Sequence, residues 1–450
     1  MESRRTTVLM LPWLAYGHLS PFLELSKKLT DKNFYIYFCS TAINLNSIKQ
    51  KLVNEKHLLS IQLVELHLPS SPDLPPNHHT TNGLPPHLMT TLKSAFDMGA
   101  PSFSQTLQTL KPDLVIYDHN CPWVPATASD HNIPAVQFLT IGASMFSLIL
   151  HMLKNRNTEF PFPEILPRNM RFIDRSNSVR EPMREADNKD GNRFRESLKR
   201  STDIVLVKTF REIEGKYIDY LYTSNEKKIV PVGPLVEDQF GLSGDRQTES
   251  TLWLDKKDKS SSVFVSFGSE CFLTREEIEE VAYGLEVSKV NFIWVLRCPM
   301  GEKVRVEELL PKGFLERVGE KGMVVEGWAP QAQILAHSSI GGFVSHCGWS
   351  SIMESMNFGV PIIALPMHLD QPFNARMVEN FGVGVEVKRG ENGDLKREEI
   401  GQVIRKVVVE KDGEDVRNKA RNLKDMLKSK GDEEIDGVVE ELLKLCRNGY

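Results

Sequence analysis

Residues 328–371 read WAPQAQILAHSSIGGFVSHCGWSSIMESMNFGVPIIALPMHLDQ. Within this stretch a short apolar run, Gly342–His346, leads into a tight turn at Cys347-Gly348, and we expect a helix to begin at about Ser351. A near-continuous apolar run of this kind is typical of a strand buried on both faces of a parallel sheet. The stretch therefore predicts the strand–turn–helix unit of an α/β fold.

The turn before that helix is a candidate phosphate site. The first turn of a helix carries unpaired N–H groups and the positive end of the helix dipole, which together favour an anion. His346, Ser350 and Ser351 surround the same turn with further donors. No Asp-x-Asp pair occurs in the chain, so the usual carboxylate clamp for a nucleotide-bound divalent cation is missing and we expect no metal.

Each of these residues also has a purely structural interpretation. Ser351 and Glu354 have the spacing of an ordinary capping box. Trp328 and Trp349 fit aromatic positions of a core, and His346 fits a hydrogen-bonded core histidine. Only their combination at this spacing favours a binding site.

The alternation of apolar runs and helical patterns continues through the whole chain. The expected strands before residue 233 are Thr7–Pro12, Phe34–Cys39, Ile61–Leu66, Asp113–Tyr117, Ala135–Phe138, Asp203–Val207 and Lys228–Val232. The later ones are Ser262–Phe267, Phe292–Arg297, Met323–Glu326, Gly342–His346 and Pro361–Leu365. We therefore predict an α/β fold of two Rossmann-like, doubly wound domains that face each other across a cleft.

Local signals mark two helix starts and one long loop. Ser20 followed by Pro21 predicts an N-cap and the first residue of a helix. Thr274–Glu277 has the pattern of a capping box. Residues 69–87 are rich in Pro, Ser and His, which predicts either a plain surface loop or a loop over the substrate cleft.

A change in composition indicates a domain boundary. Gly233-Pro234 opens a segment rich in Gly, Ser, Asp and Glu. We predict a first domain over residues 1–232, a linker over 233–252 and a second domain over 253–430. Residues 431–450 are expected to form a C-terminal helix that packs back on the first domain.

Composition restricts the possible partners. The 450 residues carry a formal net charge of −5, which gives no electrostatic reason to expect nucleic acid or an anionic membrane. The chain contains no run of about 18 apolar residues, so we expect no membrane span. The six cysteines include no C-x-x-C pair and are expected to be reduced thiols, so we predict a cytoplasmic protein, and no feature requires more than a monomer.

Two residues of the first domain are candidates for acid–base chemistry. His18 follows the first expected strand, and Asp118 follows the strand Asp113–Tyr117. The carboxyl ends of parallel strands meet at one edge of a sheet, so both side chains are expected to face the cleft. A neutral imidazole can take a proton from a hydroxyl near pH 7, and a carboxylate behind it fixes the tautomer and stabilises the imidazolium.

The stretch from Trp328 to Gln371 resembles the signature box of plant UDP-sugar-dependent glycosyltransferases, and the resemblance extends over the whole chain. It implies the fold named GT-B, with an acceptor site in the first domain and a UDP-sugar site in the second. It also implies His18 as general base and Asp118 as its partner. Gln at the last box position goes with glucose in this family, so UDP-glucose is the expected donor co-substrate and no permanently bound cofactor is expected.

The resemblance implies a donor role for each matching position. The implied donor-site residues are Ser269, Trp328, Ala329, Gln331, His346, Trp349, Ser350, Ser351, Glu354, Asp370 and Gln371. Trp328 would stack on uracil beside the Ala329 backbone, and Gln331 and Glu354 would bind the ribose. His346, Ser351 and Ser269 would hold the diphosphate. Asp370 and Gln371 would bind the transferred sugar.

Ser350 departs from the family pattern, which usually has Asn at this position. Serine keeps a donor but is shorter, so its hydroxyl would reach a phosphate only through a water. We expect somewhat weaker UDP-sugar binding than with Asn.

The expected acceptor is a small-molecule glycoside. Three segments, Trp13–His18, His79–Pro86 and Val265–Glu270, resemble a branch-forming subgroup that adds a sugar to a sugar on a flavonoid, terpenoid or lignan, through a 1→6 or 1→2 linkage. The candidate acceptor walls are Leu14, Tyr16, His119, Asn120, Phe138 and Met145.

The resulting hypothesis is direct displacement with inversion at the anomeric carbon of a UDP-sugar. The alternatives are transfer to a bare aglycone hydroxyl and a non-catalytic UDP-sugar-binding protein. Gly382-Val383-Gly384 weakly suggests an oxidoreductase glycine motif, but no third Gly follows at the required spacing. A glycosidase would not explain the donor box.

Overall fold

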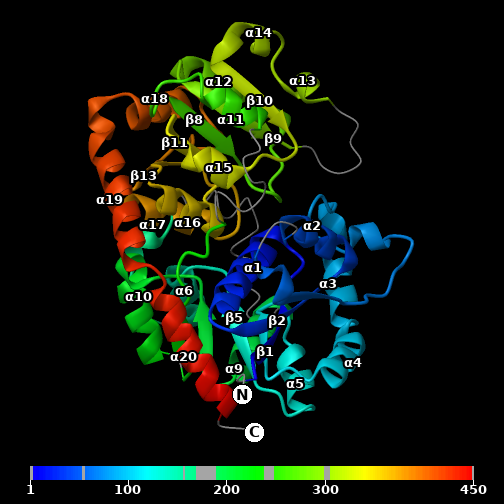
Figure 1. The fold of residues 1–450 in the computed structure, drawn as a ribbon. Coiled ribbons are helices and arrows are strands. Elements are labelled where there is room, and N and C mark those ends of the chain that lie inside the picture. The colour runs from blue at the N-terminus through cyan, green and yellow to red at the C-terminus, as the bar shows by residue number, and fades with distance from the viewer. Residues whose placement is uncertain are drawn as a thin grey trace.

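The computed structural model describes residues 4–52, 56–155, 158–168, 189–224, 226–237, 248–297 and 305–447. Figure 1 shows two lobes, one built from each half of the chain; the chain then returns, so that its last helix lies along the first lobe. Each lobe contains one parallel sheet, and the predicted α/β fold of two doubly wound domains is confirmed.

The first sheet has seven strands in the order β3-β2-β1-β4-β5-β6-β7. Their bounds are β1 Thr6–Leu11, β2 Phe34–Ser40, β3 Ile61–Glu65, β4 Leu114–Asp118, β5 Ala135–Leu139, β6 Ile204–Val207 and β7 Lys228–Pro231. The helices around it are α1 Tyr16–Asp31, α2 Ala42–Leu52, α3 Met89–Asp97, α4 Ala100–Leu110, α5 Val124–Ser129, α6 Ala143–Lys154, α9 Lys189–Arg200 and α10 Arg211–Ser224.

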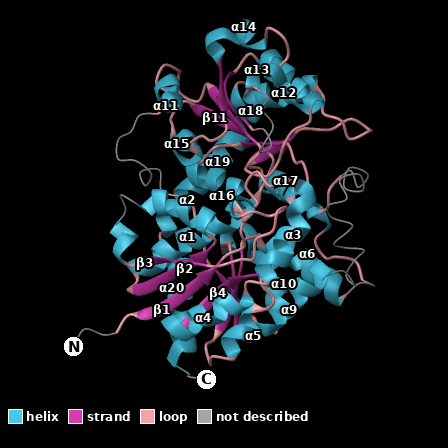
Figure 2. Ribbon diagram, turned by 90° about the vertical axis from the view of Figure 1, so that its right-hand side faces the viewer, coloured by secondary structure: helices cyan, strands magenta, loops and turns pink. Residues whose placement is uncertain are grey.

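Strand β1 explains why this sheet needs helices on both faces. Val8 and Met10 belong to the core that includes α1, whereas Leu9 and Leu11 belong to the core that includes α3 and α4. All four are fully buried. Figure 2 shows helices on both sides of the strands, as the near-continuous apolar runs predict.

The second sheet has six strands in the order β10-β9-β8-β11-β12-β13. Their bounds are β8 Ser262–Ser266, β9 Asn291–Leu296, β10 Gly322–Glu326, β11 Ile340–Ser345, β12 Ile362–Ala364 and β13 Gly384–Glu386. The helices are α11 Glu249–Leu254, α12 Arg275–Ser288, α13 Val306–Leu309, α14 Phe314–Val318, α15 Gln331–Ala336, α16 Trp349–Phe358, α17 Gln371–Phe381, α18 Arg397–Val408, α19 Glu414–Lys430 and α20 Glu433–Arg447.

Strand β13 was missed by sequence analysis because only three residues pair with β12. Gly382 ends α17 in the left-handed region, with φ of 68°. The Gly382-Val383-Gly384 segment therefore leads from a helix into a strand. A dinucleotide-binding glycine turn leads from a strand into a helix, so this segment does not support the oxidoreductase alternative.

Of the two predicted helix starts, one is confirmed and one is wrong. Thr274 Oγ1 accepts from the Glu277 N–H at 3.2 Å, and the Thr274 N–H donates to the Glu277 carboxylate at 3.0 Å. By contrast, α1 begins at Tyr16 with Ala15 as N-cap, so Pro21 lies inside the helix. Since Pro21 has no N–H, the helix lacks one backbone hydrogen bond near its start. Ser20 is not the cap.

The C-terminal helix α20 packs on the first domain. Gly431, with φ of 63°, separates it from α19. Val438 and Leu442 are fully buried in the same core as β1 and α1. Residues 238–247 of the predicted linker lie outside the described residues.

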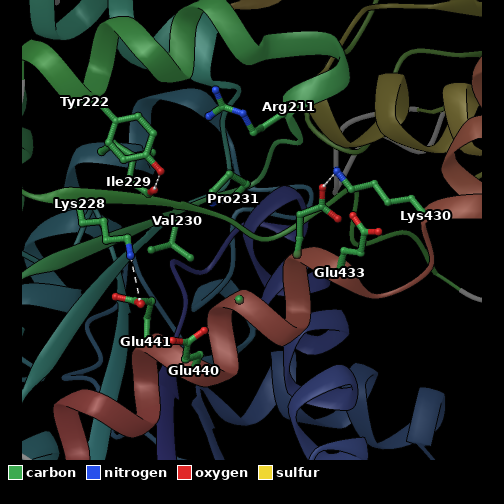
Figure 3. A pocket seen from close by; sticks show the side chains of 12 residues that line it. Arg211, Tyr222, Lys228, Ile229, Val230, Pro231, Lys430, Glu433, Glu440 and Glu441 are labelled. Atoms are coloured by element: carbon green, nitrogen blue, oxygen red, sulfur yellow. Dashed lines mark hydrogen bonds and ion pairs between the residues drawn. The ribbon is translucent and has the colours of Figure 1, made fainter.

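A cavity of about 310 Å³ lies between α20, β7 and α10 (Figure 3). Lys228 pairs with Glu441 at 3.1 Å, and Lys430 pairs with both Glu212 and Glu434. Both lysines are therefore paired with carboxylates, and no predicted site residue lines the cavity.

A search of the described residues for a helix both long and apolar enough to cross a bilayer finds none.

Candidate active site

A short hydrogen bond joins the two predicted acid–base residues of the first domain. Asp118 is the last residue of β4 and is fully buried, while His18 lies in the first turn of α1. His18 Nδ1 lies 2.6 Å from Asp118 Oδ2, and Thr140 Oγ1 lies 3.3 Å from the same nitrogen. The pair uses Nδ1 of the imidazole, and no hydrogen bond to Nε2 is found among the described residues. This arrangement orients Nε2 as the free base.

The charges around this pair keep the carboxylate ionised. Burial alone would raise the pKa of Asp118, but the charges of His18 and His119 and the bond to His18 hold its pKa at about 2. Burial likewise opposes the charged imidazole of His18, yet Asp118, with smaller effects from Glu270 and Asp370, leaves the His18 pKa above its ordinary value. Burial lowers the pKa of His119 to about 4. A proton taken by His18 is therefore stabilised, while His119 stays neutral.

His18, Asp118 and His119 also have ligand atoms within 4.8 Å of one another, which is compatible with a metal ion. His18 Nδ1 and His119 Nδ1 lie 2.6 Å and 3.2 Å from the two oxygens of the same carboxylate. An ion there would replace the hydrogen bond that orients His18.

The donor stretch forms the predicted strand–turn–helix unit. β11 ends at Ser345, Cys347 turns the chain with φ of 66°, and α16 begins at Trp349 with Gly348 as N-cap. The helix thus starts two residues earlier than predicted, and Ser351 is its third residue rather than a capping residue. The N–H groups of this first turn have no side-chain cap, so they are available to an anion.

His346 lies in a cradle of two glycines. A Cβ atom at Gly268 would lie 2.7 Å from the imidazole, and one at Gly348 would lie 2.6 Å from it. Burial lowers the pKa of His346 to about 3, and its Nδ1 is buried without a hydrogen-bond partner. The ring is therefore neutral, and its position depends on the absence of side chains on both sides. Ser269 follows Gly268 and is half-buried.

Three predicted donor residues form one hydrogen-bonded group at the start of α15. Gln331 Nε2 lies 2.5 Å from Glu354 Oε2 and 3.3 Å from Ser351 Oγ. Burial raises the pKa of Glu354. Ala329 is buried, whereas Trp328 is 53% exposed. An indole this exposed is available to stack on a planar ligand.

Asp370 and Gln371 lie at the start of α17. Gln371 Oε1 accepts from the backbone N–H groups of Met367 and His368 at 3.0 and 2.9 Å, which leaves only its amide N–H groups for a ligand. Burial raises the pKa of Asp370. Asn374 is a further residue of this group that the local sequence did not indicate. Its Nδ2 donates to Asp370 Oδ2 at 2.9 Å and to Cys347 O at 3.1 Å, and so connects α17 to the phosphate turn.

Two other donor-box residues contact the first domain. The Trp349 indole is buried and donates to the carbonyl of Lys208 at 2.6 Å, so only its backbone N–H is left for a donor molecule. Ser350 Oγ accepts from Lys208 Nζ at 3.0 Å. Lys208 was missed by sequence analysis because nothing in its local sequence indicates where α16 will lie.

The proposed acceptor walls divide into two groups. Leu14 and Phe138 are fully buried among core residues of the first domain. Met145 packs against Leu148 and against Phe373 of the second domain.

The polar members of that set lie beside charged groups. Tyr16 is partly exposed, and its hydroxyl accepts from Lys51 Nζ at 2.9 Å. The backbone N–H of Asn120 donates to Asp118 Oδ1 at 3.0 Å, and the rings of His119 and His18 lie 5.5 Å apart. His119 and Asn120 therefore stand next to the base.

The loop over residues 69–87 touches both domains. The Thr81 N–H donates to the carbonyl of Leu14 at 3.1 Å, and its hydroxyl donates to Glu270 of the second domain. His79, Thr80 and Thr81 are buried. These contacts favour a loop that borders the cleft over a plain surface loop.

Comparison with known proteins finds matches over almost the whole chain. Residues 246–417 match the family UDP-glucoronosyl and UDP-glucosyl transferase, and residues 4–237 match the glycosyltransferase N-terminal domain. UDP-glucosyltransferase 29 of Panax ginseng is 56% identical over 99% of this chain and 98% of its own. Beta-D-glucosyl crocetin beta-1,6-glucosyltransferase of Gardenia jasminoides is 51% identical over 97% and 98%. The structure of Medicago truncatula UGT71G1 complexed with UDP-glucose aligns with a TM-score of 0.76 at 29% identity, covering 98% of each chain.

Proposed function

Because the chain belongs to the UDP-glycosyltransferase family, and is thus a transferase that uses a UDP-sugar as donor co-substrate, we propose that it moves glucose from UDP-glucose to a hydroxyl of a sugar on a small-molecule glycoside. The observation that carries the chemistry is the His18–Asp118 pair at 2.6 Å, in the domain that faces the donor stretch. A non-catalytic UDP-sugar-binding protein would have no use for such a base.

The proposed reaction is a single displacement with inversion. His18 takes the proton of the acceptor hydroxyl while its oxygen forms the new bond to the anomeric carbon, and the bond from that carbon to the UDP oxygen breaks. Asp118 stabilises the resulting imidazolium. UDP leaves with the electron pair, toward the uncapped first turn of α16, whose N–H groups favour its charge.

The proposal of a sugar acceptor is supported by a relative whose substrate already carries glucose, the glucosyl crocetin 1,6-glucosyltransferase that is 51% identical to this chain. A 1→6 linkage is favoured by this relative, and a 1→2 linkage is the second candidate. The polar residues His119 and Asn120 next to the base suit a hydroxyl-rich acceptor.

A paired assay tests this proposal. UDP-glucose is supplied with a set of aglycones and, separately, with their monoglucosides, and products are identified by mass and linkage analysis. Transfer to the glucosides alone is the expected result. Transfer to the bare aglycones would keep the donor and base assignments and overturn the acceptor assignment.

Trp328→Ala is expected to raise the Kd for UDP by roughly 10- to 100-fold, because stacking of a base on an aromatic ring contributes about 1–3 kcal/mol. The indole is largely exposed, so the melting temperature is expected to change little. Isothermal titration with UDP measures the first effect and thermal unfolding the second. Unchanged UDP affinity would remove Trp328 from the uracil site.

We also propose a cytoplasmic location. Cys39, Cys121, Cys271, Cys347 and Cys446 are free thiols. Free thiols in this number favour a reducing compartment.

A further inference from the structure

Lys208 connects the first domain to the phosphate turn of the second. It follows β6 and is 2% exposed. Its carbonyl accepts from the Trp349 indole at 2.6 Å, and its ammonium donates to Ser350 Oγ at 3.0 Å. Two consecutive residues of the first turn of α16 thus bind a single residue of the other domain.

The buried ammonium of Lys208 makes few polar contacts. It has three N–H donors, and the described residues offer it one hydrogen bond, to a neutral hydroxyl. No carboxylate of the described residues lies within 4.0 Å of it; Glu354 on α16 and Glu24 on α1 act on it from farther away. Burial lowers its pKa to about 8, and these two carboxylates oppose that shift. A buried cation without a paired anion is unfavourable, so this position favours the binding of an anionic ligand group.

We propose that Lys208 is a donor-binding residue contributed by the first domain, and that its ammonium, held by Ser350 at the first turn of α16, binds the diphosphate of the UDP-sugar. This inference rests on the proposed function. It changes the interpretation of Ser350, because the serine hydroxyl orients a cation toward the site instead of replacing the usual Asn as a direct donor. Donor binding is thereby linked to contact between the two domains.

The test of this role compares the binding of UDP with that of uridine, which lacks phosphate. Lys208→Met is expected to weaken UDP binding by about 10- to 100-fold, the usual effect of losing a charge-assisted hydrogen bond. Uridine lacks the diphosphate, so its affinity is expected to stay unchanged. Lys208→Arg is expected to retain most of the UDP affinity. Lys216→Met, which removes an exposed lysine of the same domain, controls for net charge and is expected to have no effect.

The Ser350→Asn variant separates the two roles of this position. In the natural background it is expected to give no gain in UDP affinity, because Lys208 already supplies the cation. In the Lys208→Met background it is expected to recover part of the loss.

The outcomes are distinguishable. Equal losses for UDP and uridine, or no loss for either, would overturn the role of Lys208. If Lys208→Met does not fold, Ser350→Ala takes its place, with a selective loss of UDP affinity again expected and equal losses again contradicting the proposal. Failure of the unmodified protein to bind UDP would instead overturn the proposed donor.

Discussion

Replacing His18 by alanine is expected to lower kcat by roughly 10²- to 10⁴-fold while the Kd for UDP stays within about twofold of its original value. Without the imidazole, the acceptor hydroxyl has to lose its proton to water. The predicted donor residues belong to the other domain and do not bond to His18. Product formation under saturating donor measures kcat, and isothermal titration measures UDP binding.

His131→Ala is a suitable control for that experiment. His131 also belongs to the first domain and hydrogen-bonds Ser104 at 2.9 Å, apart from the His18–Asp118 pair. Its replacement is expected to leave kcat nearly unchanged. Retention of normal turnover by His18→Ala would exclude His18 as the base, and a large parallel loss of UDP affinity would assign it a binding role instead.

Replacing Asp118 by asparagine is expected to lower kcat by about 10²- to 10⁴-fold and to change the pH profile. The Asp118 carboxylate, 2.6 Å from Nδ1, favours the charged imidazole and raises the pKa of His18. The base is active only when neutral, so activity of the natural enzyme is expected to fall as the pH drops through a pKa above about 6.5. In Asp118→Asn the inflection is expected to move to lower pH.

The profile of kcat/KM against pH tests the predicted direction of this shift. An inflection that stays in place, or moves to higher pH, would contradict the assigned coupling. Because Asp118 is fully buried, thermal unfolding and UDP titration of the same variant must show a folded protein before the rates are compared.

Much of the site follows from local sequence. The apolar run of β11, the turn at Cys347-Gly348 and the polar residues after them predicted the strand–turn–helix unit. His18 and Asp118 were predicted to meet because both follow strands of one parallel sheet, and the carboxyl ends of such strands share an edge. The Thr274 capping box also followed from sequence, since both of its bonds join residues three apart.

Other features depend on contacts between residues far apart in the chain. Local signals placed the start of α1 at Ser20–Pro21, but the helix begins one turn earlier, and this puts His18 on the helix itself. Hydrophobicity alone did not separate Phe138, which is core, from Met145, which packs against the second domain.

The sequence by itself determined the parallel α/β architecture, the meeting of His18 with Asp118 and the strand–turn–helix unit, because strand period and turn residues act over a few residues. The exact starts of α1 and α16 and the short strand β13 did not follow from it. The tertiary structure alone decided what lies against that turn. Lys208 precedes Ser350 by 142 positions and reaches it only when the two domains pack together. A buried cation between domains depends on distances that no local pattern encodes, and this is why the partner of the phosphate turn had to be found in the folded protein.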